Sequence, residues 1–187
     1  KISDKRVFVI AGTGANSTEE ALHLTKGAKN SGADAALLVS PYYNKPPQEG
    51  IYCHHAKIAD EVDIPQILYN VPSRTASFIE PDTVRRLSSH QNIIGIKDAT
   101  GDMKNLSEVL NLCEADINRN NFSLYSGDDF SSLEFLKLGG HGTISVTSNV
   151  VPGVVSQICN LVQSDFSKAK ELDSRLANLN ENLFCES

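Results

Sequence analysis

The chain alternates between short apolar runs and longer stretches in which apolar residues recur at helical spacing. Apolar runs without polar alternation are typical of parallel strands that are buried on both faces. Six such runs predict strands at residues 6–12, 35–39, 66–70, 93–97, 123–126 and 143–146. Helical patterns lie between them, at residues 17–30, 48–60, 81–89, 105–114 and 128–139. Two further helices are predicted in succession, at residues 151–162 and 166–183.

Local signals support several of these helix boundaries. The segment STEE at residues 17–20 is a capping box for the first helix, and Gly32 follows its end. Pro81 suits the first turn of a helix. Asp128 or Asp129 is expected to cap the short helix that ends before Gly139.

Strict alternation of strand and helix predicts parallel strands joined by crossover helices. Short strands of similar spacing, with polar residues at their exits, favour a (β/α)₈ TIM barrel over an open sheet. A full barrel has eight such units, whereas this chain has six, so we expect it to supply strands three to eight. We expect residues 1–150 to form the partial barrel, with its final helix reaching about residue 163. Residues 164–187 would then begin a C-terminal helical region.

Composition excludes several classes of protein. The formal net charge of −6 argues against a nucleic-acid-binding surface, which needs clustered basic residues. No apolar run approaches the roughly 20 residues that a membrane-spanning helix needs. The cysteines are scattered without a CxxC pair, which argues against zinc or dithiol chemistry and favours a reducing cytoplasm. They are Cys53, Cys113, Cys159 and Cys185.

Lys97 ends the fourth apolar run and therefore lies at the exit of a buried strand. An ordinary lysine, with a pKa of about 10.4, has only about one molecule in 10³ to 10⁴ as free amine at pH 7. Burial disfavours the charged form and increases the free amine that attack on a carbonyl requires. Two interpretations stay open: an ion pair with Asp98 or Asp102, or a catalytic amine.

Tyr69 ends the preceding strand and Arg74 lies in the loop after it, on the same face as Lys97. Adjacent strands lie about 4.8 Å apart, so the Tyr69 phenol is expected near the Lys97 amine, where it could relay a proton. The guanidinium of Arg74 could hold a carboxylate by two parallel hydrogen bonds. The alternatives are a tyrosine at the barrel rim with a satisfied hydroxyl group, and a solvated arginine.

Tyr42 and Tyr43 are adjacent aromatic residues in a proline-flanked loop after the second predicted strand. Such a pair is unusual on a surface unless it binds a ligand or packs at an interface. We therefore predict a site or a subunit contact in this loop.

Six segments, in this order, resemble the dihydrodipicolinate synthase family of the Schiff-base-forming pyruvate lyases and aldolases. They are IAGTGAN (10–16), PYYN (41–44), ILYNVPSRT (67–75), IIGIK (93–97), SGDD (126–129) and GGHGTISV (139–146). The resemblance extends from residue 6 to about residue 150, and the later helices are similar as well. It implies a TIM barrel and a carbon–oxygen lyase of lysine (diaminopimelate) biosynthesis.

The resemblance also implies roles for individual residues. Lys97 matches the lysine that forms an imine with pyruvate, and Tyr69 matches the tyrosine of the proton relay. Tyr43 matches the tyrosine that such enzymes insert into the neighbouring subunit's site. Arg74 matches the arginine that recruits the carboxylate of L-aspartate 4-semialdehyde.

Two groups of ligand-binding positions are implied in the same way. Gly127 and the backbone carbonyl of Ile144 match positions that line the pyruvate pocket. Other residues match part of a dimer-interface site at which L-lysine inhibits many members of the family: Gly14, Asn16, Glu20 and Tyr42. The family's enzymes are homotetramers, dimers of dimers, and the protonated imine is the electron sink. The resemblance therefore implies no metal and no organic cofactor.

One family feature does not occur in this sequence. The proton relay needs a threonine from a Gly-Thr-Thr-Gly-Glu loop after the second barrel strand, and the chain begins at what would be strand three. The other half of the lysine site belongs to the same part of the family pattern. We therefore expect residues 1–187 alone to be inactive.

Two other functions stay open. Aldolases that cleave N-acetylneuraminate or 2-keto-3-deoxy sugar acids share the lysine and the tyrosine but usually lack the arginine that matches Arg74. An inactive barrel fragment that acts as an interaction module is the alternative outside enzymes.

Overall fold

A single parallel sheet of six strands organises the molecule, in a computed structural model that describes residues 3–186. The strands lie in sequence order, and each pairs in parallel with the next. They are β1 (Ile10–Gly12), β2 (Ala35–Val39), β3 (Gln66–Asn70), β4 (Ile93–Asp98), β5 (Ser123–Ser126) and β6 (Gly142–Thr143). The predicted alternation of strand and helix with parallel pairing is confirmed.

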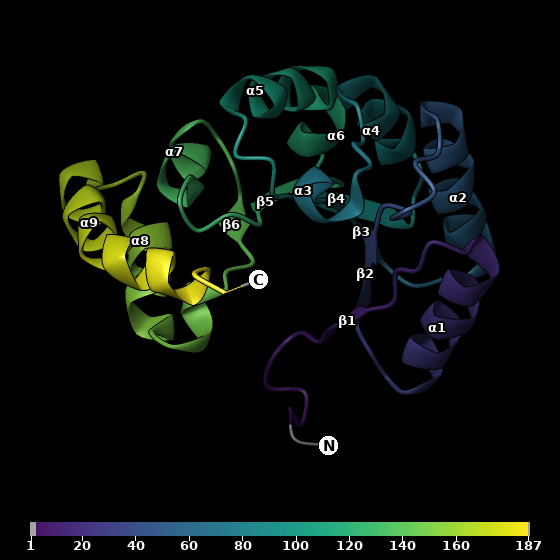
Figure 1. The fold of residues 1–187 in the computed structure, drawn as a ribbon, viewed down its shortest axis with the longest axis horizontal. Helices are drawn as coiled ribbons and strands as arrows, with labels where there is room; N and C mark the ends of the chain where they lie inside the picture. The colour runs from purple at the N-terminus through teal and green to yellow at the C-terminus, as the bar shows by residue number, and fades with distance from the viewer. Residues whose placement is uncertain (1–2, 187) are drawn as a thin grey trace.

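Helices form an outer arc around this sheet, and the arc is open on the side where the two chain ends lie (Figure 1). The arrangement is half of a barrel, because the sheet curves but β1 and β6 do not meet. The helices are α1 (Thr18–Asn30), α2 (Gln48–Glu61), α3 (Pro72–Thr75), α4 (Pro81–Ser88), α5 (Met103–Leu112), α6 (Glu114–Asn118), α7 (Ser132–Lys137), α8 (Pro152–Leu161) and α9 (Phe166–Leu183). A 3₁₀ turn, η1 (Thr147–Asn149), precedes α8.

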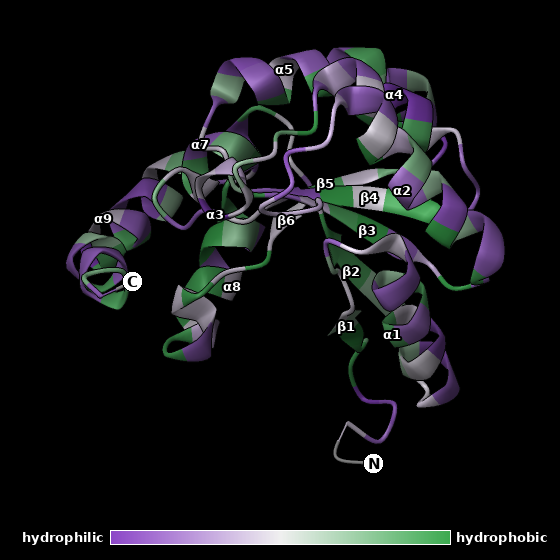
Figure 2. Cartoon of the chain, turned by 45° about the vertical axis from the view of Figure 1, so that its right-hand side comes forward, coloured by the Kyte–Doolittle hydropathy of each residue, from purple (hydrophilic) through white to green (hydrophobic). Residues whose placement is uncertain are grey.

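The main core lies between the outer face of the sheet and the helices. Leu68, Ile96 and Leu124 come from three adjacent strands and are almost fully buried there. Their neighbours along each strand point to the opposite, inner face, because side chains alternate across a strand. Figure 2 shows apolar strands behind helices with many hydrophilic outward positions. The inner face, which is not part of this core, can therefore carry polar side chains.

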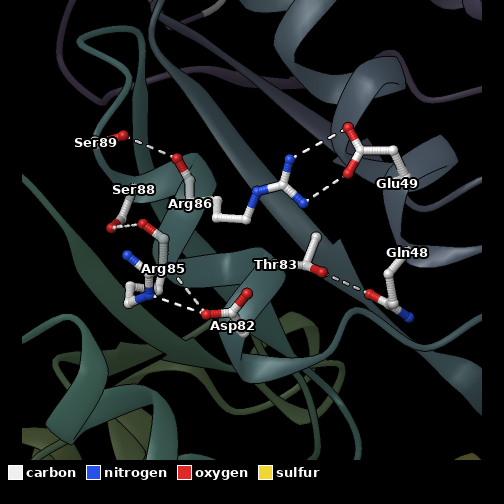
Figure 3. A network of polar contacts seen from close by, with 8 residues as sticks. All are labelled: Gln48, Glu49, Asp82, Thr83, Arg85, Arg86, Ser88 and Ser89. Atoms are coloured by element: carbon white, nitrogen blue, oxygen red, sulfur yellow. Dashed lines mark hydrogen bonds and ion pairs between the residues drawn. The ribbon is translucent and has the colours of Figure 1, made fainter.

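Polar contacts fix α2 against α4, which both pack on this core (Figure 3). The Arg86 guanidinium donates to both Glu49 oxygens, at 2.8 and 3.2 Å, and its central carbon lies 3.8 Å from the Tyr52 ring centroid. Gln48 Oε1 accepts from Thr83 Oγ1 at 2.8 Å. These contacts hold the helix that enters β3 beside the helix that enters β4.

Some predicted boundaries were wrong at the ends of the sheet. β1 begins at Ile10 rather than at residue 6, and β6 ends at Thr143 rather than at residue 146. Both are edge strands and have a ladder partner on one side only. The predicted helix at 105–114 instead begins at Met103, where Asp102 caps it. The short helix α3 was not predicted.

The expected capping of α7 by Asp128 or Asp129 was also wrong. The helix begins at Ser132 after Ser131, without a capping side chain. Asp128 instead accepts from Ser131 N and Oγ, at 3.1 and 2.5 Å. Asp129 accepts from the backbone N–H groups of Val146 and Thr147, at 2.8 and 3.1 Å. The two aspartates therefore hold the loops at the carboxyl ends of β5 and β6.

Candidate active site

Lys97 and Tyr69 lie side by side at the carboxyl ends of β4 and β3. The two residues are direct partners in the β3–β4 register. Lys97 Nζ lies 4.2 Å from the centroid of the Tyr69 ring. Both side chains are half-buried on the inner face of the sheet. The predicted approach of the tyrosine to the amine is confirmed, with the ring face rather than the hydroxyl group as the nearest described contact.

The alternative of an ion-paired lysine was wrong. In residues 3–186, no carboxylate oxygen lies within 4.0 Å of Lys97 Nζ. Asp98 points to the opposite face, where Asn70 Nδ2 and Asn105 Nδ2 donate to it. Asp102 caps α5. Burial lowers the pKa of Lys97 and the charge of Asp129 partly opposes this, so the amine has more free base than an exposed lysine.

Gly127 makes room for the Lys97 side chain. A Cβ atom on Gly127 would lie 2.6 Å from Cε and 3.0 Å from Cγ of Lys97, closer than side-chain atoms pack. The Gly127 N–H donates to the backbone carbonyl of Asp98 at 2.6 Å. The loop after β5 is therefore held directly against the lysine.

Arg74 reaches the same region from α3. Together with Tyr69, Lys97 and Gly127 it lines a hollow of about 400 Å³ at the carboxyl ends of β3, β4 and β5. Its side chain is exposed. Burial raises the pKa of Tyr69, and the positive charge of Arg74 partly opposes this rise. The hollow thus combines an amine, a phenol and a guanidinium cation, which suits a small anionic carbonyl compound.

Two aromatic residues also line the hollow and were not predicted. The ring centroids of Phe130 and Phe184 lie 5.8 Å apart at a tilt of 49°. Phe184 directly follows α9, so no local pattern in the sequence could place it near β4. The length of α9 is what carries it there.

Tyr43 and Ile144 do not line this hollow in the described part of the chain. Tyr43 is 87% exposed and has a positive φ of 74°, which is uncommon for a residue with a large side chain. Its backbone N–H donates to the carbonyl of Thr75 at 3.3 Å, next to Arg74. The Ile144 N–H donates to Ser126 O at 2.8 Å.

The four residues expected at a lysine site lie near the start of α1 (Gly14, Asn16 and Glu20) and in the loop after β2 (Tyr42). Asn44 Nδ2 donates to the backbone carbonyl of Asn16 at 3.4 Å and links these two segments. A Cβ on Gly14 would lie 2.5 Å from Val39 N, so only glycine fits there. Glu20 is exposed, and Tyr42 is 40% exposed.

No helix within residues 3–186 is long and apolar enough to cross a membrane. No group of three or more His, Cys, Asp or Glu side chains in the same range is placed to hold a metal ion.

Comparison with known proteins agrees with this geometry. The chain is 55% identical over 183 residues to the 4-hydroxy-tetrahydrodipicolinate synthase of Teredinibacter turnerae. The aligned region covers 97% of this chain and 61% of that protein. The fold matches a chloride-inhibited dihydrodipicolinate synthase from Acinetobacter baumannii in complex with pyruvate (TM-score 0.92, 50% identity, 100% of this chain and 62% of that one). It also matches a lysine-bound enzyme from Cyanidioschyzon merolae (TM-score 0.86, 37% identity, 96% and 60%).

The chain thus spans about three fifths of the length of the curated relatives it matches. The part that matches consists of the six strands and the helices described above. The profile of the Dihydrodipicolinate synthetase family matches residues 1–187. The chain therefore belongs to the dihydrodipicolinate synthetase family.

Proposed function

We propose that this chain forms the lysine-bearing part of a 4-hydroxy-tetrahydrodipicolinate synthase, which condenses pyruvate with L-aspartate 4-semialdehyde. The observation that carries the proposal is the half-buried Lys97 amine. It lies 4.2 Å from the Tyr69 ring centroid. Within residues 3–186 it has no ion-pair partner, and burial lowers its pKa. These are the conditions that favour a free, nucleophilic amine.

In this proposal the free amine of Lys97 attacks the ketone carbon of pyruvate. Loss of water gives a protonated imine, and loss of a methyl proton then gives an enamine. The enamine carbon attacks the aldehyde of the second substrate. Attack by the substrate's own amino group closes the ring and releases Lys97. The Tyr69 ring favours the cationic imine, because the face of an aromatic ring attracts a cation.

Tyr69 and Arg74 take the other two roles. The Tyr69 hydroxyl group relays protons to and from the reacting carbons, in a relay completed by a threonine outside this chain. Arg74 holds the carboxylate of the semialdehyde, since a guanidinium can donate two parallel hydrogen bonds to it. Gly127 and the carbonyl of Ile144 line the pyruvate side of the site.

Tyr43 is assigned to the site of a neighbouring subunit. Its side chain is 87% exposed and its backbone is left-handed, and both are energetically unfavourable. Contacts with a second chain would offset this cost. We therefore propose a homotetramer, a dimer of dimers, in which Tyr43 also contributes to the relay, across the interface. L-lysine is proposed to inhibit at the site that includes Gly14, Asn16, Glu20 and Tyr42. The reducing cytoplasm is the proposed location, because the exposed thiols of Cys53 and Cys185 are free.

Borohydride trapping tests the proposal. The full-length product of the gene that carries this sequence is incubated with pyruvate and reduced, and the adduct is located by peptide mass. We expect one adduct, on Lys97. No adduct, or an adduct on another lysine, would overturn the mechanism. Lys97→Arg is the matched control, because it keeps the charge and loses the nucleophile.

Two further assays separate the remaining alternatives. An aldolase would release pyruvate from a sugar acid, whereas the synthase consumes pyruvate only with the semialdehyde. Residues 1–187 alone are expected to be inactive, because they do not contain the relay threonine and because β1 and β6 each have a free edge. A full-length product without activity toward any of these substrates would instead favour an interaction module.

A further inference from the structure

Each of the two site strands carries a buried polar residue directly after its site residue. Asn70 follows Tyr69 on β3, Asp98 follows Lys97 on β4, and the two are partners in the β3–β4 register. Side chains alternate across a strand, so this second pair faces the helices while the first pair faces the hollow. Asn70 is 0% exposed and Asp98 is 7% exposed. Polar residues are rare in this layer unless their hydrogen bonds are satisfied.

The Asn70 amide group links β3 to the backbone of Ile79 and to the side chain of Asp98 on β4. Its Nδ2 donates to Asp98 Oδ2 at 3.1 Å and to the carbonyl of Ile79 at 3.4 Å. Its Oδ1 accepts from the Ile79 N–H at 3.0 Å. Ile79 closes the segment that leaves β3 and contains Arg74. Asn70 therefore connects the end of the segment that contains Arg74, at Ile79, to the residue that follows Lys97, Asp98.

The Asp98 carboxylate accepts four hydrogen bonds. Besides Asn70, it accepts from Asn105 Nδ2 at 3.1 Å and from the backbone and hydroxyl group of Thr100 at 3.0 and 2.5 Å. No cationic side chain in residues 3–186 lies within 4.0 Å of it. These bonds tie the turn that follows Asp98 and the first turns of α5 to the neighbouring strand β3.

We propose that Asn70 and Asp98 are positioning residues that hold Tyr69, Lys97 and Arg74 in reactive alignment. The inference rests on the proposed function, since it gives that site its rigid support. Neither residue touches the substrate, because both face away from the hollow. Their effect is on distance: the two bonds to Ile79 and the bond between Asn70 and Asp98 set how far Tyr69 and Arg74 lie from the amine.

A purely structural role of Asn70 and Asp98 predicts a different effect of their substitution. Loss of this pair would then lower stability without changing the reaction rate of the folded protein. Misplacement of a reacting group by about 1 Å can cost about a hundredfold in rate. We therefore expect Asn70→Asp and Asp98→Asn each to slow formation of the trapped Lys97 adduct by about tenfold to a hundredfold at equal folded fraction. Both variants are made in the full-length product.

The exchanged double variant Asn70→Asp with Asp98→Asn provides a rescue. It restores one carboxylate and one amide to the pair, so a donor again faces an acceptor between the two strands, while the bond to the Ile79 carbonyl stays lost and the rescue is partial. Asn105 Oδ1, a buried atom without a hydrogen-bond partner in the described residues, can then accept from the new amide if Asn105 turns over. We expect the double variant to react at least about five times faster than either single variant, because the pair couples in the sense of a double-mutant cycle.

Gln66→Met is the matched control. Gln66 is also fully buried on β3, but at the amino end, where its Nε2 donates to the carbonyls of Ile58 and Val62. Its replacement removes buried hydrogen bonds from the same strand without touching the carboxyl ends. We expect lower stability and an unchanged adduct rate. Single variants that react no more slowly than Gln66→Met would overturn the proposal.

A second readout does not depend on activity. Reductive methylation with ¹³C-formaldehyde labels Lys97, and its methyl signals are assigned by their absence in Lys97→Arg. Because Lys97 Nζ lies 4.2 Å from the Tyr69 ring centroid, ring current should shift these signals upfield. We expect the shift to decrease in Asn70→Asp and Asp98→Asn, to return in the double variant and to persist in Gln66→Met. An unchanged shift in both single variants would overturn the proposal even if no pyruvate adduct forms.

Failure of the proposed function is a distinct result. In that case the unmodified protein forms no adduct, while the ring-current shift still reports whether Asn70 and Asp98 control the geometry. If neither single variant folds, Asn105→Ala replaces them, since it removes one donor from Asp98 and leaves Asn70 in place. A shift and an adduct rate equal to those of the unmodified protein would then count against the proposal.

Discussion

Gly127 and Lys97 are packed so closely that a single added carbon would displace the lysine. A Cβ on Gly127 would lie 2.6 Å from Lys97 Cε and 3.0 Å from Ala99 Cβ. The loop after β5 therefore determines the path of the lysine side chain as much as β4 does. This contact gives a direct test of how strictly the amine must be placed.

Gly127→Ala is expected to slow the trapping of pyruvate on Lys97 by about tenfold to a hundredfold, because the new methyl group moves the amine. The rate of adduct formation in the full-length product measures the effect. Gly153→Ala is the control, since a Cβ on Gly153 meets no atom within 4 Å. An unchanged rate in Gly127→Ala would show that the lysine reacts equally well from another position.

Arg74→Ala is expected to separate the two substrates. Hydrogen bonds to a charged group contribute about 1.5–3 kcal/mol, so the KM for the semialdehyde should rise about tenfold to a hundredfold. Adduct formation with pyruvate should change little, because it precedes binding of the second carboxylate. Steady-state kinetics measure both, and Lys104→Ala, an exposed cation on α5, controls for the lost charge. Equal losses for both substrates would contradict the assigned role.

Because His55 is buried, we expect the protein to lose stability in acid. Its ring is fully buried on α2, both ring nitrogens lack a partner in the described residues, and burial lowers its pKa from 6.5 to about 3. The contribution of the neutral ring is fully present above pH 6.5 and is lost as the pH falls from there toward the folded-state value, because the unfolded chain takes up the proton first. At pH 5 the loss from His55 is about 2 kcal/mol.

His55→Phe should remove this part of the pH dependence. Phenylalanine fills a similar volume and leaves no hydrogen bond unmade. The free energy of unfolding should therefore decrease less between pH 7 and pH 5 in the variant than in the unmodified protein. Urea unfolding at the two pH values measures the difference. His23→Gln, an exposed substitution on α1, is the control. Parallel pH dependence of His55→Phe and the unmodified protein would contradict the prediction.

Thr147→Val should loosen the attachment of α9. Thr147 Oγ1 donates to Asn180 Oδ1 at 2.6 Å, and both residues are buried. Loss of the hydroxyl leaves the Asn180 oxygen unpaired, which costs about 1–3 kcal/mol in the free energy of unfolding. Chemical denaturation measures this. Ser174→Ala, whose hydroxyl is exposed on the same helix, should change stability by no more than about 0.5 kcal/mol.

The sequence was most informative where a strand has partners on both sides. The predicted limits of β2, β3 and β5 are those of the structure, and α9 was predicted at the same residues. β1 and β6 were predicted too long because an edge strand continues only as far as its single neighbour. The turn after Thr143 depends on Asp129, which accepts from two backbone N–H groups beyond it. That contact is not visible in a local pattern.

The site was predicted in part. Lys97, Tyr69 and Arg74 share one end of the sheet because they lie at, or just beyond, the carboxyl ends of two neighbouring parallel strands, β4 and β3. Asp98 was considered only as a partner for Lys97, although alternation along β4 already turns it to the opposite face. Its pairing with Asn70 could have been found from the sequence, since both residues lie one position beyond the site residues of adjacent strands. Phe184 had no such signal.

The position of β4 inside the sheet has a consequence for how the site arises. β3 and β5 already pair with it on either side, and every ladder joins strands that are consecutive in sequence. Lys97, Tyr69, Arg74 and Gly127 therefore come from one continuous stretch of chain, residues 66–127, which includes neither edge strand of the sheet. The Tyr69 phenol, the Arg74 guanidinium and the Lys97 amine would be assembled in the order of synthesis, and any segment that later pairs with β1 or β6 would meet an alignment that already exists.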